Sequence, residues 1–132
     1  MNFDWSEYLT LAQELASQTE GSSTQEARLR CAISRAYYAS FRKARNHLRD
    51  KEGKSQTVLT QGNTHQKVID IFTELYKEKK DIKYQKIAQF LRDLRSARNK
   101  TDYEDQVANL PKLSQTALLQ AKEVISWLGS LQ

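Results

Sequence analysis

The sequence has few of the residues that many folds require. It holds one cysteine, Cys31, together with one proline and four glycines in 132 residues. A single cysteine excludes an internal disulfide framework, and so few turn residues argue against a sheet protein. No apolar run approaches the ~18 residues of a membrane span, and the N-terminus "MNFDWSEYL" lacks the basic start of a signal peptide. We therefore expect one domain, residues 1–132, that is cytoplasmic and has no membrane partner.

Residues that bind metals or form common catalytic motifs are also scarce. Two histidines and one cysteine cannot supply a credible metal cluster. The sequence contains no HExxH, CxxC or GxSxG motif and no glycine-rich phosphate loop. We expect neither a metal site nor a cofactor.

The chain is instead rich in strong helix formers, and its apolar residues recur at helical spacing in five segments. Short polar connections separate these segments, which predicts an all-α protein, an antiparallel up-and-down bundle of about five helices. We expect Asp4, Thr24 and Asn109 to be N-caps and the polar segment 51–63 to be flexible. The expected helices run from about 4 to 17, 24 to 50, 64 onward, 82 to the region 98–102, and 109 through 128.

The longest expected helix, residues 24–50, carries most of the positive charge. Residues 28–51 hold eight lysines and arginines and one aspartate, a local balance of +7, whereas the rest of the chain holds 13 basic and 15 acidic residues. Such a local excess is typical of a site for an anionic partner, nucleic acid above all. One side of this helix is apolar and is expected to be buried: Leu29, Ile33, Ala36, Tyr37, Ser40, Phe41, Ala44 and Leu48.

Arginines recur at every seventh position of the same helix, nearly opposite the apolar stripe. Guanidinium groups bind phosphates and a tyrosine ring can stack on a base, so this arginine stripe is a candidate nucleic-acid surface. A solvated face, or a seam between two copies of the helix in a homodimer, would give the same pattern. The stripe consists of Arg28, Arg35, Arg42 and Arg49, with Tyr38 and Arg45 beside them, and its candidate binding residues are Arg35, Tyr38, Arg42 and Arg45.

His65 lies on the apolar side of the third helix, in its first turn. The positive end of a helix lowers the pKa of an imidazole, so His65 is expected to be mostly neutral and able to accept a proton. A structural hydrogen bond is the alternative role for a single histidine in this position.

The segment "LRDLRSARNKTDYED", residues 91–105, places Arg98 on the inward-leaning side of the fourth helix. Asp102 follows one turn later and can form an ion pair with it, which at a surface contributes only about a few tenths of a kcal/mol. A partly buried Arg98 would instead be a fixed fork that points at a carboxylate or a phosphate.

Three segments in this order resemble the HEPN family of small helical proteins: "AISRAYYASFRKAR" (32–45), "THQKVIDIF" (64–72) and "LRDLRSARNKTDYED" (91–105). The resemblance is to the short stand-alone prokaryotic branch and covers about residues 24–128. It implies a homodimer whose shared cleft is lined by Arg98, Asn99, Asp102 and Tyr103 and binds RNA, a nucleotide or a protein. It also implies a nucleotidyltransferase-type protein partner, as in toxin–antitoxin pairs.

The resemblance also implies a catalytic motif, which in ribonuclease members of the HEPN family is an arginine followed, after four to six residues, by a histidine. The arginine steadies the phosphate, and the histidine serves in acid/base attack by the RNA 2′-hydroxyl without a metal. Here the expected positions hold Tyr103, Glu104 and Asp105. A tyrosine with a pKa near 10, or a carboxylate near 4, carries protons poorly at neutral pH.

Three functions are therefore open, and the sequence does not decide whether the protein is an enzyme. The first is a dimeric module that binds RNA, nucleotide or a protein without full ribonuclease activity. The second is a metal-independent endoribonuclease toxin in which Arg98 holds phosphate while Asp102, Tyr103 or His65 handles protons. The third is a protein-interaction scaffold with no nucleic-acid role.

Overall fold

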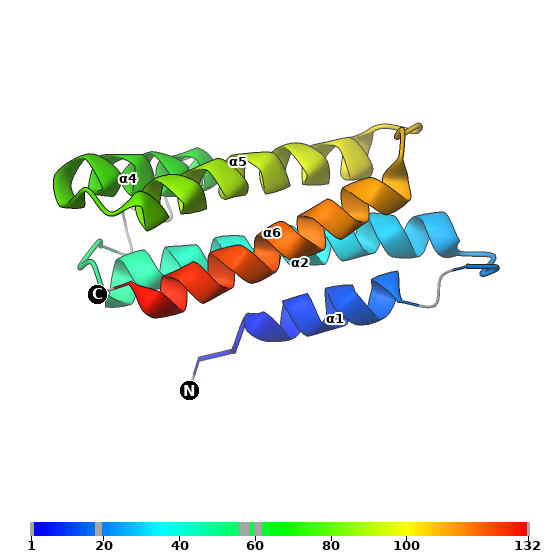
Figure 1. Ribbon diagram of the computed structural model, residues 1–132, viewed down its shortest axis with the longest axis horizontal. Helices are drawn as coiled ribbons and strands as arrows, with labels where there is room; N and C mark the ends of the chain where they lie inside the picture. Colours follow the sequence, from blue (N-terminus) through cyan, green and yellow to red (C-terminus); the bar gives the residue numbers. More distant parts are fainter. Residues whose placement is uncertain (1, 18–19, 56–58, 60–61, 132) are drawn as a thin grey trace.

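The computed structural model describes residues 2–17, 20–55, 59 and 62–131, and this part of the chain contains helices and no strand. The arrangement confirms the predicted all-α bundle (Figure 1). The helices in the described part are α1 (Ser6–Ala16), α2 (Gln25–Asp50), α4 (Thr64–Lys79), α5 (Ile82–Tyr103) and α6 (Leu110–Ser130).

Helix α2 is the centre of the bundle. It packs most extensively against α1 and α6, then against α5, and only slightly against α4. In Figure 1, α4 and α5 form an antiparallel pair along one side, α1 lies along the opposite side, and α2 and α6 lie between them. Because α4 reaches the bundle mainly through α5, its direct contacts with α2 are few and each one matters for its position.

The apolar stripe predicted for α2 is buried along its whole length. All eight positions between Leu29 and Leu48 are at most 5% exposed. Ser40, the polar member, donates its hydroxyl to the carbonyl of Ala36 at 3.1 Å, so the stripe brings no unpaired hydroxyl into the core. The helical spacing of apolar residues thus predicted the core face of α2 correctly.

Two of the three predicted N-caps, Thr24 and Asn109, occupy the N-cap positions of α2 and α6, whereas the N-cap of α1 is Trp5 and not Asp4. The carboxylate of Asp4 accepts the backbone N–H of Ser6, the first residue of α1, at 3.0 Å. The positions predicted for Thr24 and Asn109 are therefore correct, but neither side chain makes a capping hydrogen bond. The hydroxyl of Thr24 pairs with that of Ser22, and Asn109 has a left-handed backbone (φ 53°), whereas caps normally use an extended one.

The segment after α2 departs from the expected flexible loop at two positions. The carboxylate of Glu52 is 6% exposed and accepts hydrogen bonds from His47 (3.2 Å), Lys79 (2.8 Å) and Tyr84 (2.9 Å). The side chain of Leu59 is fully buried in the core. Residues 56–58, 60 and 61 lie outside the described residues. At residues 52 and 59 the segment is therefore tied to the bundle.

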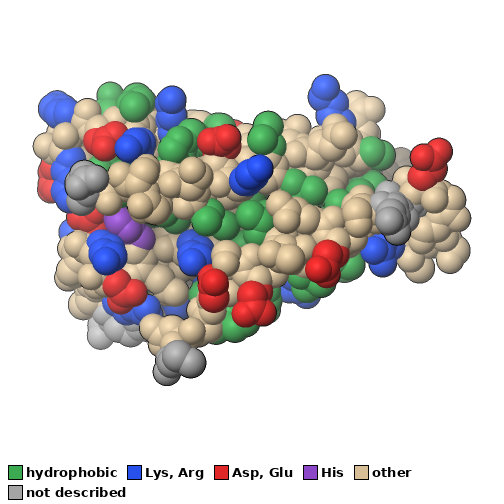
Figure 2. Space-filling model, turned by 60° about the horizontal axis from the view of Figure 1, so that its bottom comes forward, with side chains coloured by type: hydrophobic (Ala, Val, Ile, Leu, Met, Phe, Trp, Pro, Cys, Tyr) green, Lys and Arg blue, Asp and Glu red, His purple; other side chains and the backbone are tan. Residues whose placement is uncertain are grey.

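None of the described helices is long and apolar enough to cross a membrane. The face of the molecule in Figure 2 carries acidic and basic side chains close together, with hydrophobic side chains between them. That face has no extended field of one sign, so local contacts decide where positive charge is left without a partner.

We predict that Glu52→Gln lowers the free energy of unfolding at pH 7 by about 1–3 kcal/mol, because three donors lose a charged acceptor. Burial alone would raise the pKa of the Glu52 carboxyl, but the hydrogen bonds from Lys79, Tyr84 and His47 together hold that pKa below its usual value. A lowered pKa contributes stability above the unfolded pKa that is lost as pH falls through the folded one. Urea titrations at pH 7 and pH 3 should therefore show the difference from wild type shrinking in acid.

The matched control is Glu78→Gln, which removes an exposed carboxylate of α4 that has no hydrogen bond or ion pair with the described residues. It should leave stability unchanged at both pH values. A Glu52→Gln protein as stable as wild type at pH 7 would show that the network does not hold the segment.

Candidate functional site

Arg98 points into the bundle from the last turns of α5. Its side chain is 11% exposed and lies over the rings of Tyr37 (5.1 Å) and Tyr38 (5.5 Å). Nη1 approaches the Tyr38 hydroxyl at 3.5 Å and a carboxylate oxygen of Asp102 at 3.7 Å. The predicted i,i+4 pair is therefore present, but at 3.7 Å it is too long for a charge-assisted hydrogen bond and offsets the guanidinium charge only weakly.

Tyr37 and His65 join α2 to the start of α4. Tyr37 is fully buried, and its hydroxyl forms a short hydrogen bond with Nδ1 of His65. The imidazole also stacks on Phe41, with ring centres 4.3 Å apart, and meets the edge of Tyr38. His65 and Arg98, which are far apart in the sequence, therefore share the same pair of tyrosines.

The proton positions in this pair follow from the pKa shifts. Burial raises the pKa of the Tyr37 phenol, which keeps its proton. Burial and the charges of Arg95, Arg98 and Arg42 lower the pKa of His65 to about 4, so the imidazole is neutral at pH 7. The phenol has no other acceptor among the described residues, so we assign its O–H as the donor to Nδ1. The remaining imidazole proton is then on Nε2.

The three arginines that lower this pKa form what we call the arginine cluster: Arg42, Arg95 and Arg98. In each of them the Nε–H is buried and finds no acceptor among the described residues. Within the described part of the chain, Asp102 is the only carboxylate in ion-pair distance of any of the three guanidinium groups. Buried donors without acceptors cost free energy, and an anion that enters the cluster would satisfy them.

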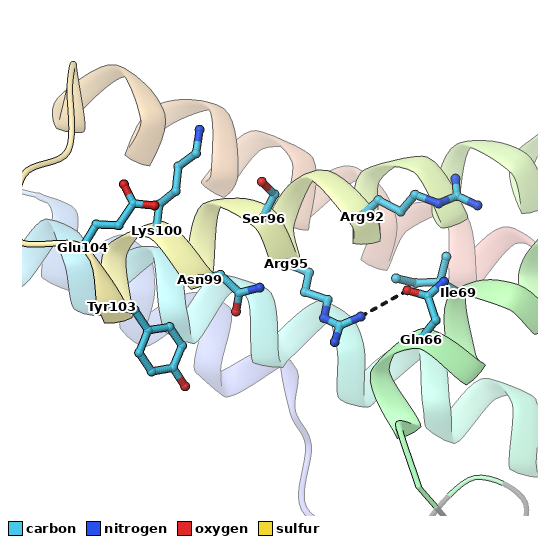
Figure 3. A pocket seen from close by; sticks show the side chains of 9 residues that line it. All are labelled: Gln66, Ile69, Arg92, Arg95, Ser96, Asn99, Lys100, Tyr103 and Glu104. Carbon is cyan, nitrogen blue, oxygen red and sulfur yellow. Dashed lines mark hydrogen bonds between the residues drawn. The ribbon is translucent and has the colours of Figure 1, made fainter.

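A groove of about 710 Å³ opens between α4 and α5 beside the cluster (Figure 3). Arg95 lines it and donates to the amide oxygens of Gln66 (3.2 Å) and Asn63 (3.4 Å). Arg92 lines it too and donates to the hydroxyl of Thr73 at 3.1 Å. Neutral acceptors thus hold both guanidinium groups in place without cancelling their charge. We call this the α4–α5 groove.

The family resemblance implies a cleft shared by two copies and lined by Arg98, Asn99, Asp102 and Tyr103, which stays a prediction; within one copy the four do not line a single hollow. Asn99 and Tyr103 line the α4–α5 groove, whereas Asp102 lines a separate hollow with Arg35. Arg98 lies between the two and points at the tyrosines. Residues three and four apart on a helix are neighbours, but a step of one residue turns the side chain by about 100°.

Three arginines of the stripe on α2 contact α1 or the residue before it, and the role of the stripe as a nucleic-acid surface or a dimer seam stays a prediction. Arg28 donates to the carbonyl of Glu14 at 3.2 Å. The guanidinium of Arg35 lies 5.4 Å from the ring centre of Tyr8, and that of Arg42 lies 4.9 Å from Trp5. Aromatic residues at the start of α1 thus hold the guanidinium groups of Arg35 and Arg42, which are still partly exposed.

The two residues beside the stripe, Tyr38 and Arg45, have different surroundings. Tyr38 is half-buried against the core and Arg98, so its ring already has a cover within the chain. For Arg45, burial and the nearby charges of Arg42 and Arg49 lower the pKa, and its only described hydrogen bond is a long one, 3.5 Å, to Asn46.

With this geometry in view, comparison with known proteins gives one match. A family model for the HEPN domain matches residues 8–131. The chain belongs to the HEPN family. HEPN domains are helical, are generally RNA-binding or ribonuclease-like modules, and commonly dimerise. The match begins inside α1, so the family domain includes the helix that contacts the arginine stripe and extends beyond the three motif segments. No curated protein and no solved structure matches the chain significantly.

Sequence reasoning missed one residue that holds the motif end of this HEPN domain. Arg30 on α2 donates to the carbonyls of Thr101 (2.8 Å), Glu104 (2.7 Å) and Asp105 (2.8 Å). These carbonyls lie at the C-terminal end of α5, where helical partners are absent. Arg30 was only one of many arginines in a basic helix, and no sequence pattern distinguished it.

We predict that the imidazole of His65 titrates near pH 4, far below an ordinary histidine. Side-chain ¹⁵N NMR would show the proton on Nε2 at pH 7, and His65→Gln would identify the signals. Arg98→Gln should raise the pKa, because a nearby positive charge is removed. Since the folded pKa is lower than the unfolded one, protonation favours unfolding as pH falls below about 6.5. A midpoint near pH 6.5 would contradict this description.

We also predict that Arg30→Ala lowers the free energy of unfolding by about 1–3 kcal/mol, because it leaves helix-end carbonyls without their charged donor. Hydrogen exchange should speed up at the end of α5, and Arg30→Lys should recover only part of the loss. Lys112→Ala, which removes an exposed charge from α6, is the control. Unchanged hydrogen exchange in Arg30→Ala would show that the Arg30 guanidinium does not stabilise the end of α5.

Proposed function

We propose that this HEPN domain is an RNA-binding module whose phosphate site is the arginine cluster, and that it binds RNA without full ribonuclease activity. The observation that carries the proposal is the set of three buried Nε–H groups in Arg42, Arg95 and Arg98, which surround the neutral His65 and have no acceptor among the described residues. A phosphodiester supplies acceptor oxygens and the negative charge that the cluster lacks.

The guanidinium groups of the arginine cluster are preorganised. Arg98 rests on two tyrosine rings, Arg42 on Trp5, and Arg95 on two amide oxygens, so the guanidinium groups are oriented before a ligand arrives. Preorganised donors lose little further entropy when an anion binds. In contrast, Arg49 faces the carboxylate of Asp50 at 2.7 Å, and Arg30 satisfies carbonyls at the end of α5.

The proton on Nε2 favours binding over cleavage. In this tautomer His65 presents a donor to a phosphate oxygen, while its basic atom, Nδ1, is occupied by the buried Tyr37 hydroxyl. A general base needs a free lone pair within reach of the 2′-hydroxyl. Asp102 and Tyr103, the other candidate proton carriers, lie on different sides of α5 from each other.

The second candidate is a metal-independent endoribonuclease, as in HEPN–nucleotidyltransferase toxin–antitoxin pairs. One observation favours it: a neutral imidazole lies beside a phosphate-binding arginine cluster, and a rearrangement that frees Nδ1 would make it a base. A homodimer, common among HEPN domains, would bring two such clusters into one particle.

We predict that labelled RNA binds the wild-type protein and that Arg98→Gln weakens binding about tenfold or more, because a charged hydrogen-bond donor is lost. Fluorescence anisotropy at several salt concentrations measures this, and the affinity should fall steeply with salt. Lys122→Gln, which removes an exposed charge from α6, is the control and should bind like wild type. Circular dichroism checks that Arg98→Gln folds.

The same samples, incubated in EDTA, separate the two candidates. The binding module leaves the RNA intact, whereas the endoribonuclease cleaves it and loses that activity in His65→Gln and Arg98→Gln. Absence of binding by the wild type, or equal binding by Arg98→Gln, would rule out the arginine cluster as the phosphate site.

A further inference from the structure

Three side chains on one side of α5 line the α4–α5 groove at equal spacing. Arg95, Asn99 and Tyr103 are spaced four residues apart, and Figure 3 shows their side chains extending from the same side of the helix. At 1.5 Å per residue they span about 12 Å. A guanidinium, an amide and a phenol ring thus follow one another along the groove, one turn apart.

Most of the charged residues that line the α4–α5 groove are cationic. Arg92, Arg95 and Lys100 line it, and Glu104 is the only acidic residue among the described lining residues. None of these three cations is in ion-pair distance of a carboxylate within the described chain. A polyanion that lies in the groove would therefore meet positive charge along much of its length.

Tyr103 is the most exposed large hydrophobic side chain in the described chain, at 77%. Its ring makes no aromatic or cation–π contact with any described residue, whereas the more buried Tyr37 and Tyr38 make several. An exposed ring among apolar neighbours would fit a protein partner, but the other residues that line this groove are three cations, the acidic Glu104 and polar side chains, with Ile69 as the one apolar residue of the lining. A base stacked above a phosphate-binding groove fits these neighbours better.

We propose that the α4–α5 groove binds an unpaired stretch of RNA, with its backbone on Arg92 and Arg95 and a base stacked on Tyr103. This deepens the proposed function and rests on it, because Arg95 belongs both to the arginine cluster and to the groove. The backbone runs from the cluster along α5, and the amide of Asn99 meets the edge of a base.

Stacking on the Tyr103 ring requires a single-stranded ligand. In an A-form duplex the bases are paired and stacked on one another, so their faces cannot reach Tyr103. A duplex would meet only the positive charges. Loss of the Tyr103 ring therefore affects a single strand and leaves a duplex unaffected, whereas loss of the Arg92 charge weakens both.

The experiment compares one labelled RNA, free and annealed to its complement, by fluorescence anisotropy with the full-length protein. Tyr103→Leu should weaken single-strand binding roughly 5- to 150-fold, the range expected for one stacked base, and leave duplex binding unchanged. Tyr103→Phe keeps the ring and should bind like wild type. Arg92→Gln should weaken both RNAs and reduce the slope of log affinity against log salt by about 0.7 for the single strand. Leu119→Ala, at an exposed apolar residue of α6, is the control.

The outcomes separate this proposal from the one on which it rests. If Arg98→Gln loses RNA binding while Tyr103→Leu and Arg92→Gln bind single strands like wild type, the groove proposal is overturned and the arginine cluster stands. Equal losses on duplex and single strand in Tyr103→Leu overturn the stacking role. A change of oligomeric state in Tyr103→Leu, seen by analytical ultracentrifugation with normal RNA binding, assigns the ring to a protein interface instead.

Discussion

The hydroxyl of Tyr37 is buried at the centre of the bundle and must find a hydrogen-bond partner there, and His65 is that partner. An unpaired buried hydroxyl would cost about 1–3 kcal/mol, so the two residues fix the start of α4 against α2, helices that otherwise touch little. The same bond places the imidazole on Phe41 and leaves the two tyrosine rings to support Arg98. The position of the arginine cluster thus depends on the hydrogen bond between Tyr37 and His65.

The way the arginines are held decides what they can do. Elsewhere in the described chain several cations pair with carboxylates: Lys43 with Asp4, and Lys79 with Glu52. In the cluster and groove the supporting groups are tyrosine rings, amide oxygens and a hydroxyl, which orient a guanidinium but carry no charge to cancel it. The net positive charge of +5 therefore says less about function than the identity of the neighbours of three or four arginines.

Much of the fold followed from the sequence, because burial is periodic and local. The eight apolar positions of α2, the helical segments and the inward turn of Arg98 were all predicted from spacing. The neighbours of the arginine stripe were not, because the spacing that turns Arg35 and Arg42 away from the core cannot show that Tyr8 and Trp5 of another segment contact them. The family resemblance gave the motifs in order but not the Tyr37–His65 bond, and Arg30 acts across more than seventy residues of chain.

The absence of the motif histidine and the protonation state of His65 lead to the same interpretation, namely that the site is suited to bind a phosphate and not to accept a proton. In the motif, a histidine after the arginine would lie at the exposed end of α5, where water keeps its pKa near neutrality and both nitrogens accessible. His65 reaches the arginine from the opposite helix instead, and there burial and three positive charges depress its pKa while the Tyr37 hydroxyl occupies Nδ1. An anion bound to the cluster would offset those charges and raise the pKa again. The neutral imidazole with its proton on Nε2 is thus suited to donate to a bound phosphate, and bringing it to accept a proton would require breaking the bond that positions α4.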